Sequence, residues 1–425
     1  MRKTLPYIGK YMSKWLIVAT FMGFGGGISA VALKQAIHLM EAGSLFLPLA
    51  FAPVVGGIIL SIILLWDPIA AGFGSDHYIY EVNHDKKYLA GKTMLSKLFS
   101  TAVTLGFRGS GGVEGPMLVI GGSIGDIFSR IPILNRFYHK EDERILTICG
   151  AAGGIGAIFH SPLGGGIFVV EVLYKSSLHY GDLFPAILSS TMGFVIYGVF
   201  AESTPLFYAP SYSPDVMNVH WFILTGILAG VVSLLFMTSF GVIQKLFAKL
   251  PRRGIHPILG GILTGALLFY LPDVGGTGTH MIQRMINGSF PMAFLLLLLA
   301  GKVFATSFTV ASGGSAGLVI PSLFLGAITG NLLSSVLVAD AGLNASLVIA
   351  GMAASLASVA NVPVAAAIML IEMVGLQLGV PATLGSIVGY AIGHSRVIYG
   401  VTHPDQWQFE ETIKWRSIDA TSDCH

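Results

Sequence analysis

The sequence predicts an all-α protein that crosses a membrane several times and consists of two similar halves with many short, broken helices. Of its 425 residues, 53% are hydrophobic and only 11% are charged, whereas soluble domains carry about 25% charged residues. Apolar stretches of membrane-spanning length recur along the chain, and one pattern of small residues, proline and glutamate occurs twice. We therefore expect a multi-pass integral membrane protein in contact with the lipid bilayer.

The apolar stretches have two lengths. A membrane-spanning helix needs about 20 residues, but the pieces near 117–128 and 163–174 are shorter and are broken by Gly, Pro or Ser. We interpret them as half-helices whose ends meet inside the protein, because irregular backbone at that depth must be covered by protein or face a watery cavity. This pattern favours a transporter or channel over a simple anchor. The longer stretches lie near 16–33, 46–66, 183–200, 219–240, 256–271, 291–310, 346–372 and 380–393.

The two ends of the chain predict its orientation. Basic residues precede the first apolar stretch, which is too long for a secretory signal and lacks a clean cleavage site. We expect a retained first segment with a cytoplasmic N-terminus, in a prokaryotic inner (plasma) membrane, and a short cytoplasmic tail over 401–425. Cys149 and Cys424 are expected to be free thiols. The net charge of +2 gives no indication of a nucleic-acid partner.

The repeat predicts two matching halves. Gly150 precedes Pro162 by 12 residues, and Glu171 follows nine residues later; Gly351, Pro363 and Glu372 have the same spacing. Upstream, Ser110-Gly111-Gly112 resembles Ser312-Gly313-Gly314. Repeated halves with broken helices at matching positions are typical of transporters whose site lies between the halves. We expect one domain over 1–425, with a first half of about 15–200 and a second half of about 215–400.

The segment Gly109–Pro116 is the strongest candidate site. It places Glu114 among glycines, whose backbone freedom lets amide N–H groups turn toward a common point. An ionised side chain in mid-membrane costs about 2.5–3.5 kcal/mol on insertion scales, so such a residue is a functional candidate by default. The alternative is a glutamate at the rim of a solvated loop. A carboxylate in the place of an anion suggests a gate.

A second glycine-rich run, Ser312–Pro321, offers free amides without an acid among them. Amide dipoles hold an anion loosely enough for it to leave, as conduction requires. Glu171 and Glu372 end apolar half-helices, where each acid either serves transport, faces solvent or caps a neighbouring helix. The remaining charged candidates, Lys97, Arg108 and Lys302, either raise the local anion concentration or extend to the membrane interface.

The sequence gives no indication of an enzyme. Gly121–Gly125 fits the G-x-S-x-G pattern, but no strand precedes it and no triad partners are evident. There is no H-E-x-x-H motif and no closely spaced Cys/His set, so we expect neither a metal nor another cofactor.

These motifs resemble those of the CLC family of chloride channels and chloride/proton antiporters. Gly112–Pro116 is similar to the family's G-[RK]-E-G-P, whose glutamate gates the anion path, and Gly317–Pro321 resembles G-x-F-x-P. Ser161–Glu171 and Glu372-Met373 also match family motifs, in order and spacing, over roughly residues 15–400. The resemblance implies a homodimer of inverted-repeat subunits without CBS domains, each with its own pore and with Glu114 as its gate. The implied anion contacts are Gly112, Val113, Gly115, Gly317, Leu318 and Val319.

Several positions depart from the family pattern. Where the family has G-S-G-x-P, an ungapped register lays Phe73 on the chloride-binding serine, whereas a shifted register uses Gly74 and Ser75. We favour the first, because it leaves Lys97 opposite a basic residue common in the family. The tyrosine expected shortly after Glu372-Met373 is missing from the next few residues. Val172 stands where antiporters of the family usually carry an inner glutamate, and Val113 replaces the usual basic residue.

The expected function is therefore transport of chloride or another halide through a pore gated by Glu114, either channel-like or weakly coupled to protons. The alternative is a proton-coupled antiporter for chloride or fluoride. In either case the candidate proton path contains Glu114 and Glu171. A receptor or enzyme that transports nothing is the remote alternative.

Overall fold

The computed structural model describes residues 4–84, 89–131, 140–174, 178–201, 204–213, 215–251, 253–394 and 396. These residues form sixteen α-helices, five short 3-10 helices and no named strand, which confirms the predicted all-α class. The tail over 401–425, with Cys424, lies outside the described residues. The helices of the first half are α1 (Thr4–Ser44), α2 (Ala52–Trp66), α3 (Ser75–His84), α4 (Gly91–Gly106), α5 (Glu114–Ser129), α6 (Lys140–Ile158), α7 (Pro162–Glu171) and α8 (Tyr180–Phe200).

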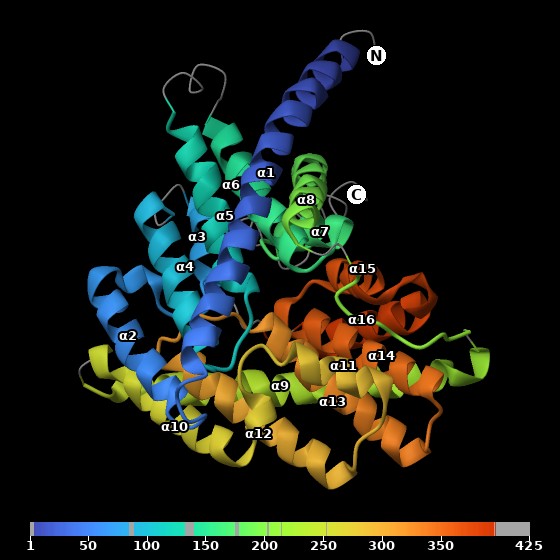
Figure 1. Ribbon diagram of the computed structural model, residues 1–425. Coiled ribbons are helices and arrows are strands. Elements are labelled where there is room, and N and C mark those ends of the chain that lie inside the picture. Colours follow the sequence, from blue (N-terminus) through green and yellow to red (C-terminus); the bar gives the residue numbers. More distant parts are fainter. Residues whose placement is uncertain are drawn as a thin grey trace, which may run out of the picture.

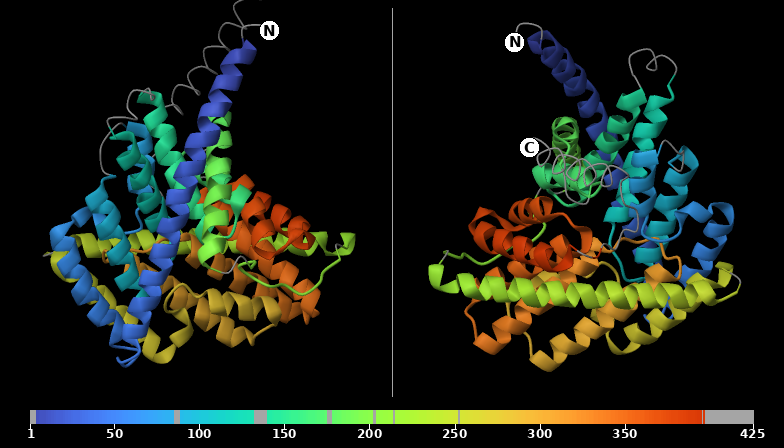
Figure 2. Two further views of the ribbon diagram at one scale, coloured as in Figure 1. Left: turned by 45° about the horizontal axis from the view of Figure 1, so that its top comes forward. Right: turned by 180° about the vertical axis from the view of Figure 1, so that it is seen from behind.

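The second half repeats the same helix order. It contains α9 (Val219–Lys249), α10 (His256–Tyr270), α11 (Thr279–Asn287), α12 (Met292–Ala311), α13 (Val319–Leu337), α14 (Ala341–Ala360), α15 (Pro363–Val374) and α16 (Gly379–Gly393). In Figure 1 the blue-to-green helices of the first half and the yellow-to-red helices of the second half gather largely in separate parts of the bundle. The N-terminal end of α1 projects from the bundle, and α9 runs along the whole second half (Figure 2).

Long and broken apolar helices coexist, as the sequence predicts. Within the part of the chain that the structure describes, seven helical segments are long and apolar enough to cross a membrane, among them Tyr11–Ser44, Val216–Lys249 and Ala341–Ala360. Four shorter apolar helices in the same part, including Pro162–Glu171 and Pro363–Val374, are too short to span alone. The apolar stretch 346–372 is divided between α14 and α15, because Asn361 is left-handed (φ 57°) and Pro363 starts a new helix.

Glycine pairs let matching helices of the two halves approach closely. A Cβ added at Gly121 of α5 would meet the Gly150 carbonyl of α6, and one at Gly150 would meet the Gly121 carbonyl. Gly326 of α13 and Gly351 of α14 form the same reciprocal contact in the second half. Backbones can touch in this way only where neither helix carries a side chain, so the repeat preserves the packing as well as the helix order.

The variant Gly351→Ala is expected to destabilise the fold by about 1–3 kcal/mol, because its methyl group meets backbone that cannot move aside. The measurement is thermal unfolding of the purified protein, followed by tryptophan fluorescence. Gly43→Ala is the matched control, since a Cβ at Gly43 would meet nothing within 4 Å. Equal melting temperatures for the two variants would contradict this account of the α13–α14 contact.

Candidate functional site

The starts of α5 and α13 meet at the centre of the molecule. Gly112 donates its N–H to the Gly317 carbonyl (2.8 Å), and Gly317 donates to the Gly112 carbonyl (2.7 Å). This antiparallel bridge joins the two glycine runs directly before the helices begin. The residues between bridge and helix, Val113 and Leu318, have nearly identical backbone angles (φ −108° and −114°). The two helix N-termini are thus arranged as copies of each other around one point.

Side-chain hydroxyl groups on each half form hydrogen bonds to the equivalent residues of the other half around this junction. Thr101 bonds to Ser315 (2.9 Å), and Ser110 bonds to Thr306 (3.0 Å). The amide of Ser110 donates to Thr309 Oγ1, and the amide of Ser315 donates to Thr104 Oγ1, both over 3.1 Å. Exchanged pairs of this kind indicate an approximate twofold axis between the halves, in agreement with the expected inverted repeat.

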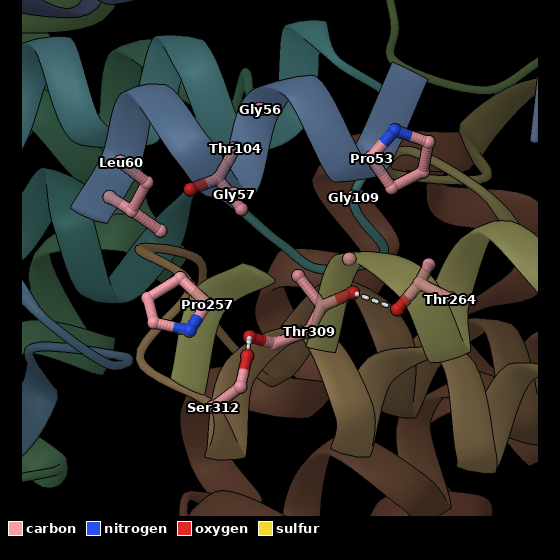
Figure 3. Close-up of a pocket in the computed structure, with 12 residues that line it drawn as sticks. Pro53, Gly56, Gly57, Leu60, Thr104, Gly109, Pro257, Thr264, Thr309 and Ser312 are labelled. Atoms are coloured by element: carbon pink, nitrogen blue, oxygen red, sulfur yellow. Dashed lines mark hydrogen bonds between the residues drawn. The ribbon is translucent and has the colours of Figure 1, made fainter. Parts of the chain in front are cut away.

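This pattern corrects one expectation from the sequence. Ser110-Gly111-Gly112 corresponds to Ser315-Ala316-Gly317, three residues later than the resemblance to Ser312-Gly313-Gly314 suggests. Ser312 lies instead beside a small cavity of about 20 Å³ between α2 and α10, together with Thr264 and Thr309 (Figure 3). Its hydroxyl donates to the Thr309 carbonyl, so its role is to close the end of α12.

Glu114 is fully buried at the junction. Its Oε1 accepts a hydrogen bond from the Val319 amide (2.6 Å), while its Oε2 has no partner among the described residues. This bond comes from the start of α13, in the other half of the chain. A helix N-terminus carries partial positive charge and unpaired amides, so it favours a negative group at this place.

Gly112 and Gly317 enclose the carboxylate from two sides. A Cβ added at either residue would collide with the carboxylate group of Glu114. Neither position therefore has room for a Cβ while the Glu114 side chain lies here. Of the predicted anion contacts, Gly112, Val113, Gly317, Leu318 and Val319 all lie in the two segments that meet at this carboxylate.

The loop before α3 approaches from a third direction. A Cβ added at Gly115 would meet the Phe73 carbonyl and would lie 2.9 Å from Ser75 Oγ. Gly72 and Gly74 have positive φ (70° and 86°), which turns the chain sharply before α3. The ring of Phe73 packs against Phe240 of α9, with centroids 6.2 Å apart, whereas the buried Ser75 hydroxyl has no partner among the described residues. Phe73, Gly74 and Ser75 thus all lie beside the residue that follows Glu114.

Lys97 and Lys302 are fully buried, so neither extends to the membrane interface. The Nζ of Lys97 donates to the carbonyls of Ala70 (3.0 Å) and Gly72 (2.7 Å), in the loop before α3. The Nζ of Lys302 donates to the carbonyls of Val274 and Gly276, both over 3.1 Å, in the matching loop before α11. Each lysine fixes one loop through hydrogen bonds to its carbonyls, which the sequence alone did not indicate.

Glu171 and Glu372 cap each other's helices. The carboxylate of Glu171, at the end of α7, accepts from the amides of Val364 (3.1 Å) and Ala365 (2.7 Å) at the start of α15. The carboxylate of Glu372, on α15, accepts from the amides of Leu163 (3.0 Å) and Gly164 (2.9 Å) at the start of α7. Of the alternatives that the sequence leaves open for these acids, capping a neighbouring helix is the one that the structure displays.

Two of the departures from the family pattern concern the residues that follow these acids. Val172, in the place of the inner glutamate, is buried. Of the tyrosines that follow Glu372, Tyr390 lies on α16 with its ring 6.0 Å from the ring of His394. Tyr399 lies outside the described residues.

A cavity of about 680 Å³, here called the vestibule, adjoins the junction. Val113 and Ile320, the neighbours of Glu114 and Val319, form part of its wall. Arg108 also lines it and pairs with Glu41 of α1 (3.2 Å). The vestibule thus borders the junction and carries charged side chains on its wall.

Comparison with known proteins identifies the family. The sequence model of the family described as "Voltage gated chloride channel" matches residues 55–394. The chain belongs to this family, the CLC family. Together with the seven candidate spans, this membership makes the chain an integral membrane protein.

Relatives cover nearly the whole chain. An uncharacterised protein of Methanocaldococcus jannaschii, MJ0305, is 30% identical, over 92% of this chain and 96% of its own length. The H+/Cl− exchange transporter ClcA of Vibrio cholerae is 28% identical, over 84% of this chain and 81% of its own. Solved CLC structures share the fold at 20% identity: a slow cyanobacterial Cl−/H+ antiporter (TM-score 0.81, 91% of this chain and 96% of that one) and a CLC-type fluoride/proton antiporter (TM-score 0.80, 91% and 97%).

Proposed function

We propose that this CLC chain transports small inorganic anions, chloride or another halide, across the lipid bilayer, and that Glu114 gates the path. The observation that carries the proposal is the Glu114 carboxylate. It is buried between two glycine runs and accepts a hydrogen bond from one helix-start amide, and its second oxygen has no partner among the described residues. A carboxylate and a halide compete for the same amides, so the path is closed while the side chain occupies them. We place the anion contacts at Gly112, Val113, Gly115, Gly317, Leu318 and Val319, with Phe73, Gly74 and Ser75 beside them.

We further propose that transport is channel-like or weakly coupled to protons. Protons need a titratable relay through the membrane, yet Val172 offers none and the carboxylate of Glu171 is occupied by two amides of α15. Proton-coupled exchange of chloride or fluoride is the second candidate. It is favoured by the 28% identity to the H+/Cl− exchange transporter ClcA over most of the chain.

The test is flux from liposomes that contain the purified protein, measured for chloride, fluoride and nitrate with a pH electrode in the same vessel. Anion flux without stoichiometric proton movement supports the channel-like proposal. Proton movement against its gradient in a fixed ratio to the anion would establish the exchanger instead. If no anion moves at all, the transport proposal is rejected, and the alternative of a receptor or enzyme that transports nothing is favoured.

The variant Glu171→Gln tests the candidate proton path through Glu114 and Glu171, and Glu372→Gln is its matched control. Each removes the charge from one helix cap, so both are expected to lower stability by a similar amount, about 1 kcal/mol. Any proton movement that accompanies the anion should fall only in Glu171→Gln. Melting temperatures and the pH electrode measure the two effects. Equal proton movement in both variants would remove Glu171 from the path.

The assembly and orientation are also proposals. We propose a homodimer with one pore in each subunit, in a prokaryotic inner membrane, with both termini cytoplasmic. Each subunit is proposed to be one domain, with halves of about 15–200 and 215–400. Family membership supports this arrangement.

A further inference from the structure

Lys97 and Lys302 occupy equivalent places in the two halves. Each is fully buried and donates to carbonyls of the loop before a short helix, α3 or α11. A Cβ added at Gly74 would lie 3.1 Å from the Nζ of Lys97, and one at Gly278 would lie 3.3 Å from the Nζ of Lys302. Both lysine side chains therefore end directly behind their loops.

The residues that lead into the two loops differ in charge. In the first half the 3-10 helix Pro68–Ala70 precedes the loop and follows Asp67. In the second half the 3-10 helix Pro272–Val274 precedes the loop and follows Leu271. Asp67 is buried. The repeat thus has a buried acid in one half where the other half has an aliphatic side chain.

The residue directly before each of these lysines differs in the same way. In the first half it is Ser96, whose hydroxyl donates to the Asp67 carboxylate. In the second half it is Gly301, where an added Cβ would lie 2.9 Å from Leu271 Cδ1. The same contact between helix and loop is therefore polar in the first half and apolar in the second.

The second half serves as an internal control for the first. Its loop has matching left-handed glycines, Gly276 (φ 58°) and Gly278 (φ 80°), and its lysine lies over the Phe324 ring, 4.8 Å from the centroid. This loop forms without an acid in the place of Asp67, so the fold of such a loop does not require the carboxylate. Because burying a carboxylate costs free energy, its presence in the first half points to a role in the charge balance there.

That role concerns the protonated form of Lys97. The Asp67 carboxylate accepts from the Ser96 hydroxyl and from the Ile69 amide (3.2 Å), and its charge acts on the Lys97 side chain. Burial disfavours the protonated form of a lysine, whereas a nearby carboxylate favours it. With the acid present, a protonated Lys97 has its counter-charge inside the protein and needs none from a bound anion.

We propose that Asp67 is an internal counter-charge for Lys97, and that it keeps halide binding at the α3 end of the Glu114 path weak and nearly independent of pH. A halide beside this loop then leaves readily, as conduction requires. Without the acid, a bound halide itself becomes the counter-charge, so the anion and a proton bind together and the affinity rises as the pH falls. The inference rests on the proposed anion transport.

The test is calorimetric titration of the full chain in lipid nanodiscs with chloride, over a pH series, in a Glu114→Gln background. This substitution removes the carboxylate that competes with the anion. Asp76 and His77 at the start of α3 also interact electrostatically with Lys97, and both stay the same in every variant. A difference between variants is therefore assigned to the residue that was changed.

Asp67→Asn keeps the size of the side chain and a polar group at each contact, but it removes the charge. Its chloride affinity is expected to exceed that of the background at least about fivefold at the acid end of the series, and to fall back toward it as the pH rises. Damage to the fold would weaken chloride binding at every pH, so the sign of the change separates the charge from a structural role. If Asp67→Asn does not fold, the double variant Asp67→Leu with Ser96→Gly, which copies the contact of the second half, carries the same expectation.

Asp142→Asn is the matched control, because it removes an equal charge from an acid that pairs with Lys14 of α1 (2.5 Å). Its chloride affinity should equal that of the background at every pH. Ser96→Ala removes the hydroxyl that holds the carboxylate but keeps the charge. It should lower the melting temperature and change the chloride affinity much less than Asp67→Asn does.

Chloride affinity in Asp67→Asn that exceeds the background at no pH, or an equal rise in Asp142→Asn, would overturn the counter-charge. Chloride flux from liposomes distinguishes this failure from a failure of transport. If the background protein carries chloride while Asp67→Asn binds it no more tightly, only the counter-charge is rejected. If the background protein neither binds nor carries chloride, the proposed transport is rejected and the counter-charge with it.

Discussion

Replacing Glu114 by glutamine is expected to raise halide flux about tenfold or more and to remove the dependence of flux on pH. When the wild-type carboxylate is ionised, its charge-assisted hydrogen bond from an amide such as that of Val319 is worth about 1.5–3 kcal/mol net. Glutamine is neutral and binds the same amide more weakly, so an anion displaces it more readily. Each 1.4 kcal/mol changes an equilibrium about tenfold. Flux from liposomes over a series of pH values measures both effects.

The control for this variant is Glu372→Gln, which also neutralises a carboxylate bonded to backbone amides, at the start of α7. Its flux should retain the pH dependence of the wild type. A wild-type rate and pH response in Glu114→Gln would reject the gate, and the proposed path with it.

Gly317→Ala has the second large expected effect, a loss of flux of at least about tenfold. Its new methyl group would lie where the Glu114 carboxylate now lies, and the backbone of Gly317 is held by its two hydrogen bonds to Gly112. The methyl group therefore excludes the side chain and the anion alike. The double variant with Glu114→Gln distinguishes two mechanisms. If the methyl group only displaced the Glu114 side chain, the double variant would conduct at least as well as the wild type. If the methyl group blocks the path itself, flux in the double variant stays low although the Glu114 charge is gone.

Gly288→Ala is the matched control for Gly317→Ala, because a Cβ at Gly288 would meet nothing within 4 Å. Its flux and melting temperature should equal those of the wild type. Flux in Gly317→Ala at the wild-type level would contradict the location of the path between the two glycine runs.

The sequence predicts the fold class, the broken helices and the central acid, because these depend on local properties. Hydrophobic composition requires membrane helices, and Pro162 and Pro363 start new ones because proline fits a first helical turn. Glu114 stands out because a charge in an apolar stretch is costly. Each of these signals is contained within a few neighbouring residues.

The contacts of the site depend on the other half of the chain, which spacing does not specify. That Glu114 bonds to Val319, and that Glu171 and Glu372 cap opposite helices, follows only when the two halves are packed together. The incorrect match of Ser110-Gly111-Gly112 to Ser312-Gly313-Gly314 also arises because the sequence does not specify contacts between the halves. Serine and glycine recur within 312–317, so the letters fit at two registers, and the tertiary hydrogen bond between Thr101 and Ser315 selects the later one.

The bridge between Gly112 and Gly317 has a consequence for the speed of opening. Its two hydrogen bonds tie the starts of α5 and α13 together, so the passage cannot widen by separating these helices unless both bonds break. In the proposed gate, the part left to move is one side chain, which accepts a hydrogen bond from the Val319 amide. Side-chain torsions can change within nanoseconds, whereas collective helix motions take microseconds to milliseconds. The waiting time between opening events is then set by how long one carboxylate stays bound, and rates across a series of variants should follow the strength of that bond.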